Sequence, residues 1–466
     1  MSYHNLHNDI ITAIATPSGS SALGIIRLSG DGCVSLVNAI FKGKDITKAF
    51  SHTLHYGFIM DEDEMIDEVM ISIYEPKKSF TTQESIEITC HGSAYILHRI
   101  LFLLLKKGAR MAEAGEFTQR AFLNGRIDLT QAEAIADLIA SETQSQHEMA
   151  MKQMRGGVSK EINYLRQELI DFAALLELEL DFSEEDVEFA NRGKLSQLIT
   201  DILEKIGNLN QTFKYGNAIK KGIPVVIAGK PNAGKSTLLN VLLNEDRAIV
   251  SHIAGTTRDV IEEVIIWDGI PYRLIDTAGL REAGDKIEKI GIEKTYSKIN
   301  ESAILLYIFD TSANQNEDIY NEIKALNSPK TQIILVGNKV EAISEKDKKQ
   351  WEDSLAEFTN GIANLVFISA KENYQIKELI DTLMEVAKTQ IPKQGSTVIS
   401  NMRHYKALED TKEILQNVLP KIEFKEPTEI ISFDIREALG YLGSISGEID
   451  SEDVLDSVFS RFCIGK

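Results

Sequence analysis

The stretch GKPNAGKS, residues 229–236, decides the fold of this chain. It fits the phosphate-loop pattern, follows an apolar run at 224–228 and precedes a helical segment at 237–243, which is the order of strand, loop and helix that such a loop requires. Its glycines allow backbone N–H groups to wrap phosphates, Lys235 reaches the phosphate oxygens, and the Ser236 hydroxyl ligates the Mg²⁺ that neutralises them. The stretch therefore predicts a nucleotide site formed by Asn232, Ala233, Gly234, Lys235, Ser236 and Thr237, with a catalytic role for Lys235.

The chain on both sides of this loop alternates between apolar runs and helical segments. Such alternation is typical of a mostly parallel sheet that helices cover on both faces. Asp268-Gly269, between two apolar runs, predicts one antiparallel hairpin within that sheet. The predicted strands lie at 224–228, 264–267, 304–309, 333–336 and 365–368.

Short polar motifs follow several of these strands, where doubly wound sheets place their ligand loops. Together they resemble the motif set of small GTP-binding proteins, in which Thr257 would reach Mg²⁺ and the γ-phosphate and Gly279 would sense that phosphate. Glu341 stands where those proteins carry Asp, and it offers guanine the same bidentate carboxylate one methylene further out. The predicted contacts are Thr256, Thr257, Asp276, Thr277, Ala278, Gly279, Asn338, Lys339, Glu341, Ser369, Ala370 and Lys371.

Leu280 follows Gly279, at the position where Ras-like enzymes carry the glutamine that orients the attacking water. An apolar side chain cannot orient water, so hydrolysis requires another polar residue. The following segment offers Glu282, Asp285, Glu288 and Glu293, each of which is equally explained as a solvated acidic side chain.

The segments before and after the sheet domain have different residue patterns. Residues up to about 119 mix short apolar runs with Gly- and Ser-rich turns, which predicts an α+β domain. From residue 128 the pattern is helical: Thr130 and Glu133 have capping-box spacing, and apolar residues recur at helical spacing at Leu165, Leu169, Phe172, Ala173 and Leu176. A helical pattern of apolar residues returns at 406–418 and 428–441, which predicts that the sheet domain is inserted into a helical domain.

The composition excludes several classes of protein. The chain has 466 residues and no apolar stretch near the roughly 20 residues of a bilayer crossing, so we expect no membrane span. Cys33, Cys90 and Cys463 lack the spacing of a disulfide frame or zinc site and are expected to be reduced thiols of a cytoplasmic protein. The net charge of -20 repels nucleic acid, so any RNA contact must use a local basic patch.

Five further motifs bear on identity: IATPSG at 14–19, GEFTQRAFLN at 115–124, DLTQAEAIAD at 128–137, AGTTRD at 254–259 and FCIGK at 462–466. With the phosphate loop, they make the chain resemble the MnmE (TrmE) family of tRNA modification GTPases over its whole length. The resemblance implies a multidomain α/β protein: an α+β folate-binding and dimerisation domain at 1–121, a discontinuous helical domain at 122–221 and 389–466, and an inserted Ras-like P-loop GTPase domain at 222–388.

The resemblance also implies partners and chemistry. A homodimer would act with the flavoprotein MnmG, in a heterotetramer, to add an aminomethyl-type (carboxymethylaminomethyl) group to C5 of the wobble uridine of certain tRNAs, with a tetrahydrofolate derivative in its 5-formyl or methylene form as carbon donor. The competing interpretation is an RNA- or ribosome-associated GTPase switch with no part in modification, against which the folate motifs argue.

Carried over by position, the folate site falls on Arg27, Glu84, Arg126 and Lys466, where a carboxylate can accept from pterin amino groups and cations can hold the acidic tail. Separate surface salt bridges would explain these residues too. Cys463 in the terminal motif could be a nucleophile, a cofactor contact or a neighbour of the folate pocket.

The resemblance further implies a K⁺-dependent GTPase whose two GTPase domains pair during hydrolysis. A bound K⁺ would supply positive charge where other systems use an arginine finger, and Glu288 would position the attacking water. The K⁺ positions are Asn232 in the phosphate loop and Ser251, Ile253 and Thr256 in the loop that follows. The predicted nucleotide contacts of that second loop also include His252, Ala254 and Gly255.

Overall fold

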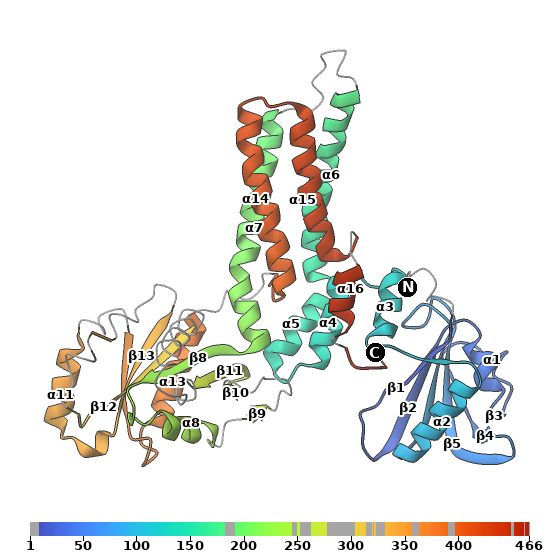
Figure 1. Cartoon of the computed structure of the whole chain (residues 1–466), viewed down its shortest axis with the longest axis horizontal. Helices are drawn as coiled ribbons and strands as arrows, with labels where there is room; N and C mark the ends of the chain where they lie inside the picture. The colour runs from blue at the N-terminus through green and yellow to red at the C-terminus, as the bar shows by residue number, and fades with distance from the viewer. Residues whose placement is uncertain are drawn as a thin grey trace, which may run out of the picture. The chain divides into compact units, whose positions relative to one another are not determined.

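The structure, a computed structural model (Figure 1), describes residues 9–181, 192–244, 249–251, 262–276, 303–313, 319, 321–322, 331–356, 363–389, 397–448, 452–460 and 462–465. The chain forms two compact units. Unit 1 comprises Met1–Ile139, Met151–Asn191 and Pro420–Lys466, and unit 2 comprises Ala140–Ala150 and Arg192–Leu419. The predicted division of the chain at residues 121, 221 and 388 remains a prediction.

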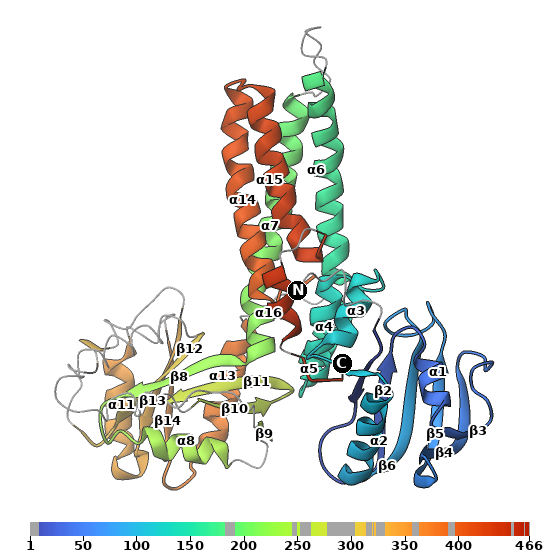
Figure 2. The same cartoon turned by 45° about the vertical axis from the view of Figure 1, so that its right-hand side comes forward.

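Unit 1 contains a mainly antiparallel sheet with the order β3-β4-β5-β6-β2-β1-β7, in which β1 and β7 run parallel. Ile26, Leu28, Ile86 and Ile88 face one side of the sheet and form a buried core with two helices, of which α2 is visible against the sheet in Figure 2. This confirms the predicted α+β domain. The elements are β1 (Ile11–Ile14), β2 (Ser21–Ser29), α1 (Cys33–Asn38), β3 (Phe41–Gly43), β4 (Thr53–Asp61), β5 (Glu64–Tyr74), β6 (Ser85–Gly92), α2 (Ala94–Lys106) and β7 (Arg110–Met111).

The remaining elements of unit 1 are helices: α3 (Glu116–Leu123), α4 (Leu129–Ile139), α6 (Gly157–Asp181), α15 (Thr428–Ser446) and α16 (Glu452–Phe459). Leu165, Leu169 and Leu176 of α6 are buried, as their helical spacing predicts. α15 packs along α6, so a segment near the C-terminus completes a helical layer begun some 250 residues earlier.

The predicted capping pair at the start of α4 is wrong by two residues. Asp128 Oδ1 accepts a hydrogen bond from Gln131 N (2.8 Å), and Gln131 Oε1 accepts one from Asp128 N (3.0 Å). Asp128 and Gln131 have the same three-residue separation as Thr130 and Glu133, and the cap belongs to the residue that immediately precedes the helix. Thr130 Oγ1 instead donates to Asp128 Oδ1 (2.7 Å).

Unit 2 contains the predicted parallel sheet, with the order β14-β13-β12-β8-β11-β10-β9. Among the described strands of this sheet, β10 runs in the opposite direction to the others, and it meets β11 at Asp268 (φ 50°) and Gly269 (φ 71°), the tight turn that the sequence predicts. The strands are β8 (Ile223–Gly229), β9 (Ile249–Ser251), β10 (Glu262–Trp267), β11 (Ile270–Asp276), β12 (Ile304–Asp310), β13 (Gln332–Asn338) and β14 (Ala363–Ile368).

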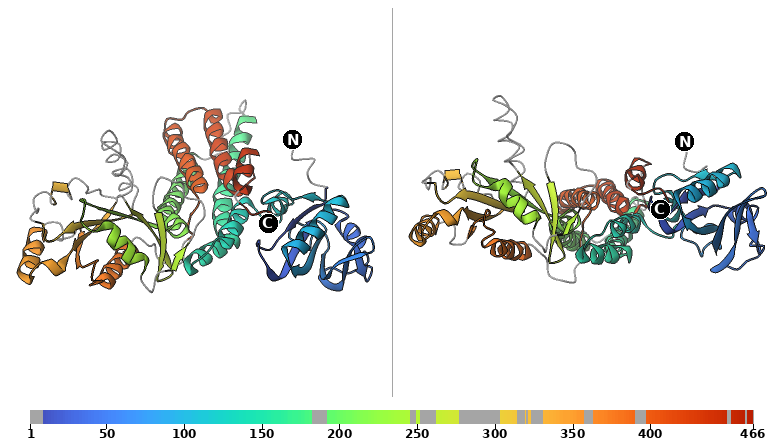
Figure 3. Two further views of the ribbon diagram at one scale, coloured as in Figure 1. Left: turned by 60° about the horizontal axis from the view of Figure 1, so that its bottom comes forward. Right: turned by 90° about the horizontal axis from the view of Figure 1, so that it is seen from below.

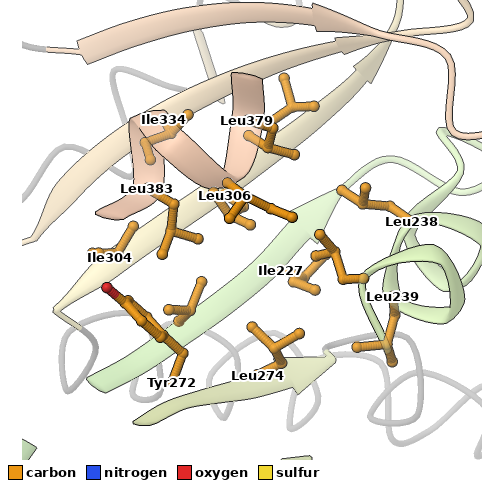
Figure 4. Close-up of a cluster of buried hydrophobic side chains, with 14 of the residues drawn as sticks. Ile227, Leu238, Leu239, Tyr272, Leu274, Ile304, Leu306, Ile334, Leu379 and Leu383 are labelled. Atoms are coloured by element: carbon orange, nitrogen blue, oxygen red, sulfur yellow. The ribbon is translucent and has the colours of Figure 1, made fainter. Parts of the chain in front are cut away.

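Helices cover both faces of this sheet (Figure 3). On one face Ile227, Leu306 and Ile334 meet Leu238 of α8 (Lys235–Leu243) and Leu379 of α13 (Ile376–Thr389), as Figure 4 shows. On the other face, Val226 and Leu305 belong to the core that includes Trp351 of α11 (Glu345–Ser354). Adjacent residues of one strand thus enter opposite cores, which explains why these strands read as continuous apolar runs.

Two long helices flank the sheet in the sequence of unit 2. α7 (Arg192–Lys221) leads directly into β8, and α14 (Met402–Glu423) contains the predicted helix at 406–418. α5 (Gln144–Met154) has residues in both units, and so does α14, because its last residues from Pro420 on belong to unit 1. Among the helices that the structure describes, none is both long enough and apolar enough to cross a membrane.

Candidate functional site

The phosphate loop lies between β8 and α8. Gly229 ends the strand with a φ of 149°, and a Cβ at this position would overlap the carbonyl oxygen of Ile308 on β12. Gly234 precedes α8 with a φ of 100°, a left-handed backbone conformation that is unfavourable for residues with a Cβ atom. Both glycines are therefore required by the backbone path of the loop.

Asn338 connects three loops at the carboxyl edge of the sheet. Its Nδ2 donates to Ala233 O in the phosphate loop (2.8 Å), and its Oδ1 accepts from Ala370 N in the loop after β14 (3.0 Å). The side chain is 3% exposed, so both hydrogen bonds are shielded from water. One amide thus holds together segments that lie more than 100 residues apart.

Two lysines are positioned by oxygen atoms around the same site. Lys235 Nζ donates to Gly229 O and Lys230 O, both at 2.9 Å, so the ammonium group is held inside the loop. Lys339 has a φ of 67° and pairs with Asp310 Oδ2 at 2.5 Å. Partial burial works against ionisation of Asp310, but the hydrogen bonds from Lys339 and Ser312 outweigh it and hold the pKa of the Asp310 carboxyl below its ordinary value.

Lys235, Asn338 and Lys339 line a cavity of about 630 Å³, within the usual size range of small-molecule sites. Its wall includes the exposed side chains of Ser236 and Thr237 at the start of α8, and those of Glu341 and Lys371 from the loops after β13 and β14. Ser369 is not part of the wall: its side chain is buried, and its hydroxyl accepts a hydrogen bond from Glu372 N (3.1 Å) within the loop. The lining residues are Pro231, Asn232, Gly234, Lys235, Ser236, Thr237, Asn338, Lys339, Glu341, Ala370 and Lys371.

Several predicted site residues lie outside the described residues: His252, Ile253, Ala254, Gly255, Thr256, Thr257, Thr277, Ala278, Gly279, Glu288 and Lys466. For Ser251 and Asp276 the structure describes the backbone, at the ends of β9 and β11.

A second cluster of predicted residues lies in unit 1. Arg27 donates to Glu87 Oε1 through Nε (2.9 Å) and a terminal nitrogen (2.8 Å), contacts Gly465 O at 3.4 Å, and has its guanidinium over the ring of Phe117. Arg126 lies over the ring of Phe80, which packs against the same buried cluster as Phe117. Two of the predicted folate residues therefore lie beside one apolar cluster, called here the aromatic cluster because it contains Phe80 and Phe117, and Arg27 also contacts the C-terminal segment.

Glu84 lies elsewhere. Its Oε2 accepts from Val34 N (3.1 Å) at the start of α1, in the helix-covered core of the sheet. Burial, with a contribution from the Glu84 carboxylate, raises the pKa of the neighbouring Cys33 thiol. The carboxylate beside Arg27 is that of Glu87, which was not among the predicted site residues. Glu87 of β6 lies opposite Arg27 of β2 because of the register in which the two strands pair, and no short sequence pattern indicates that register.

The three cysteines are free thiols, as predicted. Cys33 and Cys90 are buried, and Cys463 is exposed. Cys463 lies between Phe462, which is buried, and Ile464, which is exposed and forms a β-bridge with Ala114.

Comparison with known proteins decides the family. Residues 10–126 match the GTP-binding protein TrmE N-terminus, and residues 129–463 match the MnmE helical domain. The chain is 48% identical to a tRNA modification GTPase MnmE of Cytophaga hutchinsonii over 99% of this chain and 98% of the relative. The chain belongs to the MnmE family. The same name is carried by relatives from Flavobacterium psychrophilum, 45% identical over 99% of this chain and 100% of the relative, and from Bacteroides thetaiotaomicron, 46% identical over the same shares.

Membership of the MnmE family confirms the resemblance found in the sequence, the predicted combination of TrmE N-terminal, helical and P-loop domains, and the predicted enzyme class, a GTPase of tRNA modification.

Proposed function

We propose that this GTPase of the MnmE family acts with the flavoprotein MnmG, in the cytoplasm, to install a carboxymethylaminomethyl-type group on C5 of the wobble uridine of tRNA, with a tetrahydrofolate derivative as carbon donor. The observation that carries the proposal is the cavity built from the phosphate loop, Asn338 and the loop at 369–371, in a chain matched by MnmE proteins along its length.

The residues around the cavity fit GTP or GDP. The left-handed Gly234 turns the loop so that backbone N–H groups at the start of α8 can meet phosphate oxygens, and Lys235 adds a positive charge. Glu341, exposed in the wall, is the proposed partner of the guanine N–H groups. Ser236 and Thr257 are the proposed Mg²⁺ ligands, and Mg²⁺ would neutralise phosphate charge.

Hydrolysis is proposed to depend on Glu288, which would orient the attacking water, since Leu280 cannot. Asn232 supports a K⁺ site beside the phosphates, because it is exposed and forms part of the cavity wall. The other proposed K⁺ ligands are backbone or hydroxyl oxygens of Ser251, Ile253 and Thr256, a set of neutral oxygens that suits a monovalent ion.

The aromatic cluster of unit 1 is the proposed folate site. Phe80, which is partly exposed, offers a surface for a planar ring, and Arg27, Arg126 and Lys466 offer cations for carboxylates. We assign the carboxylate that accepts from the pterin to Glu87, because Glu84 is engaged with α1. The exposed Cys463 belongs to the same C-terminal segment as Lys466, and we propose that it contacts the cofactor.

The proposed assembly is a homodimer that joins MnmG in a heterotetramer and binds tRNA. A local basic cluster at Lys214, Lys220 and Lys221 is the available electrostatic attraction for RNA in a chain of net charge -20.

The test is mass analysis of tRNA nucleosides from a strain that lacks this protein, complemented with the wild type, Lys235→Ala or the control Lys346→Ala. Lys346 is an exposed lysine of α11 outside the cavity. We expect the C5 group to be lost in the deletion strain, restored by the wild type and Lys346→Ala, and not restored by Lys235→Ala. An unchanged nucleoside pool in the deletion strain would reject the proposal in favour of an RNA- or ribosome-associated switch.

A further inference from the structure

Three apolar side chains project from the end of the α14–α15 hairpin, the turn that joins these two helices in Figure 1. Phe424 is 78% exposed, Phe433 is 67% exposed and Ile430 is 39% exposed. We call these three residues the hairpin patch. Two phenylalanines at this exposure leave on the order of 300 Å² of apolar surface in water, the size of the largest apolar patch on a typical monomer, which is often a functional surface.

The hairpin patch is built on ordered backbone. Phe424 N donates to Pro420 O (2.8 Å) and Glu426 N donates to Lys421 O (2.9 Å), so the turn after α14 is closed by its own hydrogen bonds. Lys421 pairs with Asp434 at 2.6 Å and ties the end of α14 to α15. Ile430 lies one helical turn before both Phe433 and Asp434, so it shares one side of α15 with Phe433 and with the carboxylate that pairs with Lys421.

The surroundings of the hairpin patch are acidic. Residues 420–437 carry five carboxylates and three cations. Two of the cations are already engaged, Lys421 with Asp434 and Arg436 with Glu177 of α6 at 2.8 Å. The exposed carboxylates around the apolar centre are Glu423, Glu426, Glu429 and Glu437.

This charge restricts what can cover the patch. RNA and anionic lipid surfaces are repelled by an acidic rim. A second copy of the chain, paired through the same face, would bring two acidic rims together. The surface that matches is a protein face with an apolar centre and a rim of lysine and arginine.

We propose that the hairpin patch is the docking surface for the protein partner of the modification complex, through an apolar and basic face of that partner. This inference rests on the proposed function, in which the partner is the flavoprotein MnmG. It adds the location of the interface, at the end of the helical hairpin and outside the nucleotide cavity and the folate cluster, and the chemistry of the opposing face.

The test is calorimetric titration of purified MnmG into the full-length protein. The variant is Phe424→Ser with Phe433→Ser, and the matched control is Phe50→Ser with Phe102→Ser, two phenylalanines of unit 1 that are 80% and 74% exposed. We expect the hairpin variant to raise the dissociation constant at least about 10-fold, since exposed aromatic anchors dominate interface energy. The control should bind as the wild type does, and both variants should keep wild-type GTP hydrolysis.

A second variant, Glu426→Lys with Glu437→Lys, keeps the apolar centre and reverses two rim charges. It should also weaken MnmG binding, and the loss should shrink as salt is raised. Equal MnmG affinity in the wild type and the Phe424→Ser, Phe433→Ser variant would overturn the inference alone. Absence of MnmG binding by the wild type would overturn the proposed partnership as well. A change in oligomeric state, or in tRNA affinity with MnmG affinity unchanged, would reassign the patch to a second copy or to RNA and overturn the inference.

Discussion

The contact between Gly234 and Asn338 makes a quantitative prediction. A Cβ at Gly234 would overlap Asn338 Nδ2, and Asn338 is the amide that holds Ala233 and Ala370. Gly234→Ala should therefore act in two ways: it forces alanine into a left-handed conformation, and it drives the Asn338 side chain off its two partners.

The magnitudes follow from these two effects. Left-handed strain costs about 1–2 kcal/mol, and two net hydrogen bonds are worth about 1–3 kcal/mol together. Asn338→Ala alone should weaken GDP binding by the value of the two hydrogen bonds, which raises the dissociation constant about 5- to 150-fold. Gly234→Ala should weaken GDP binding by the hydrogen bonds and the backbone strain together. In the Gly234→Ala background, Asn338→Ala should cost nothing further, because the two hydrogen bonds are already lost.

The assay is calorimetric GDP binding to the wild type, both single variants and the double variant. Gly207→Ala in α7 is the control, since a Cβ there meets no atom within 4 Å. If the two substitutions are additive in the double variant, Asn338 does not move in response to residue 234 and the structural reasoning is refuted.

Four other predictions test separate sites. Glu87→Ala should weaken binding of 5-formyltetrahydrofolate in calorimetry, while Glu84→Ala should change it less. A larger loss of affinity in Glu84→Ala than in Glu87→Ala would contradict the proposed folate site. Glu288→Ala should leave GTP affinity near wild type and lower hydrolysis about 10²- to 10⁴-fold in a single-turnover assay, and equal rates would exclude this residue from the mechanism. Hydrolysis should be faster in K⁺ than in Na⁺, and Asn232→Ala should reduce that stimulation more than it reduces GTP affinity; identical rates in both salts would contradict the ion site. The pKa of Asp310 is lowered in the folded protein, so its ion pair with Lys339 should stabilise the fold at pH values above the ordinary pKa of 3.8 and lose that contribution as the pH falls below it. In urea unfolding, the difference in stability between the wild type and Asp310→Asn should therefore disappear only at acidic pH.

The order of strands and helices in unit 2 was predictable because it depends on local patterns. The apolar runs at 224–228, 304–309 and 333–336 are each part of an observed strand, extended by one or two residues at most at an end. The Asp268-Gly269 turn forms where the dipeptide predicts it. Local sequence governs these features because the conformational preference and the pattern of burial both act over a few neighbouring residues.

The start of α4 shows where local patterns are ambiguous. Asp128 with Gln131 and Thr130 with Glu133 satisfy the same spacing, and a choice between them requires the first helical residue to be known. Helix boundaries depend on packing beyond the cap, so the pattern predicted the helix and not its capping pair.

By itself the sequence determined that the chain has a phosphate loop, a parallel sheet around it and the motifs of one family. Only the tertiary structure decided which carboxylate accompanies Arg27, because Glu87 comes opposite it through the register of β2 and β6 and Glu84 does not. It also decided that Asn338 joins the loops at Ala233 and Ala370. Each of these contacts unites segments distant in the chain, and its geometry depends on strand order and register, which no short stretch of residues encodes.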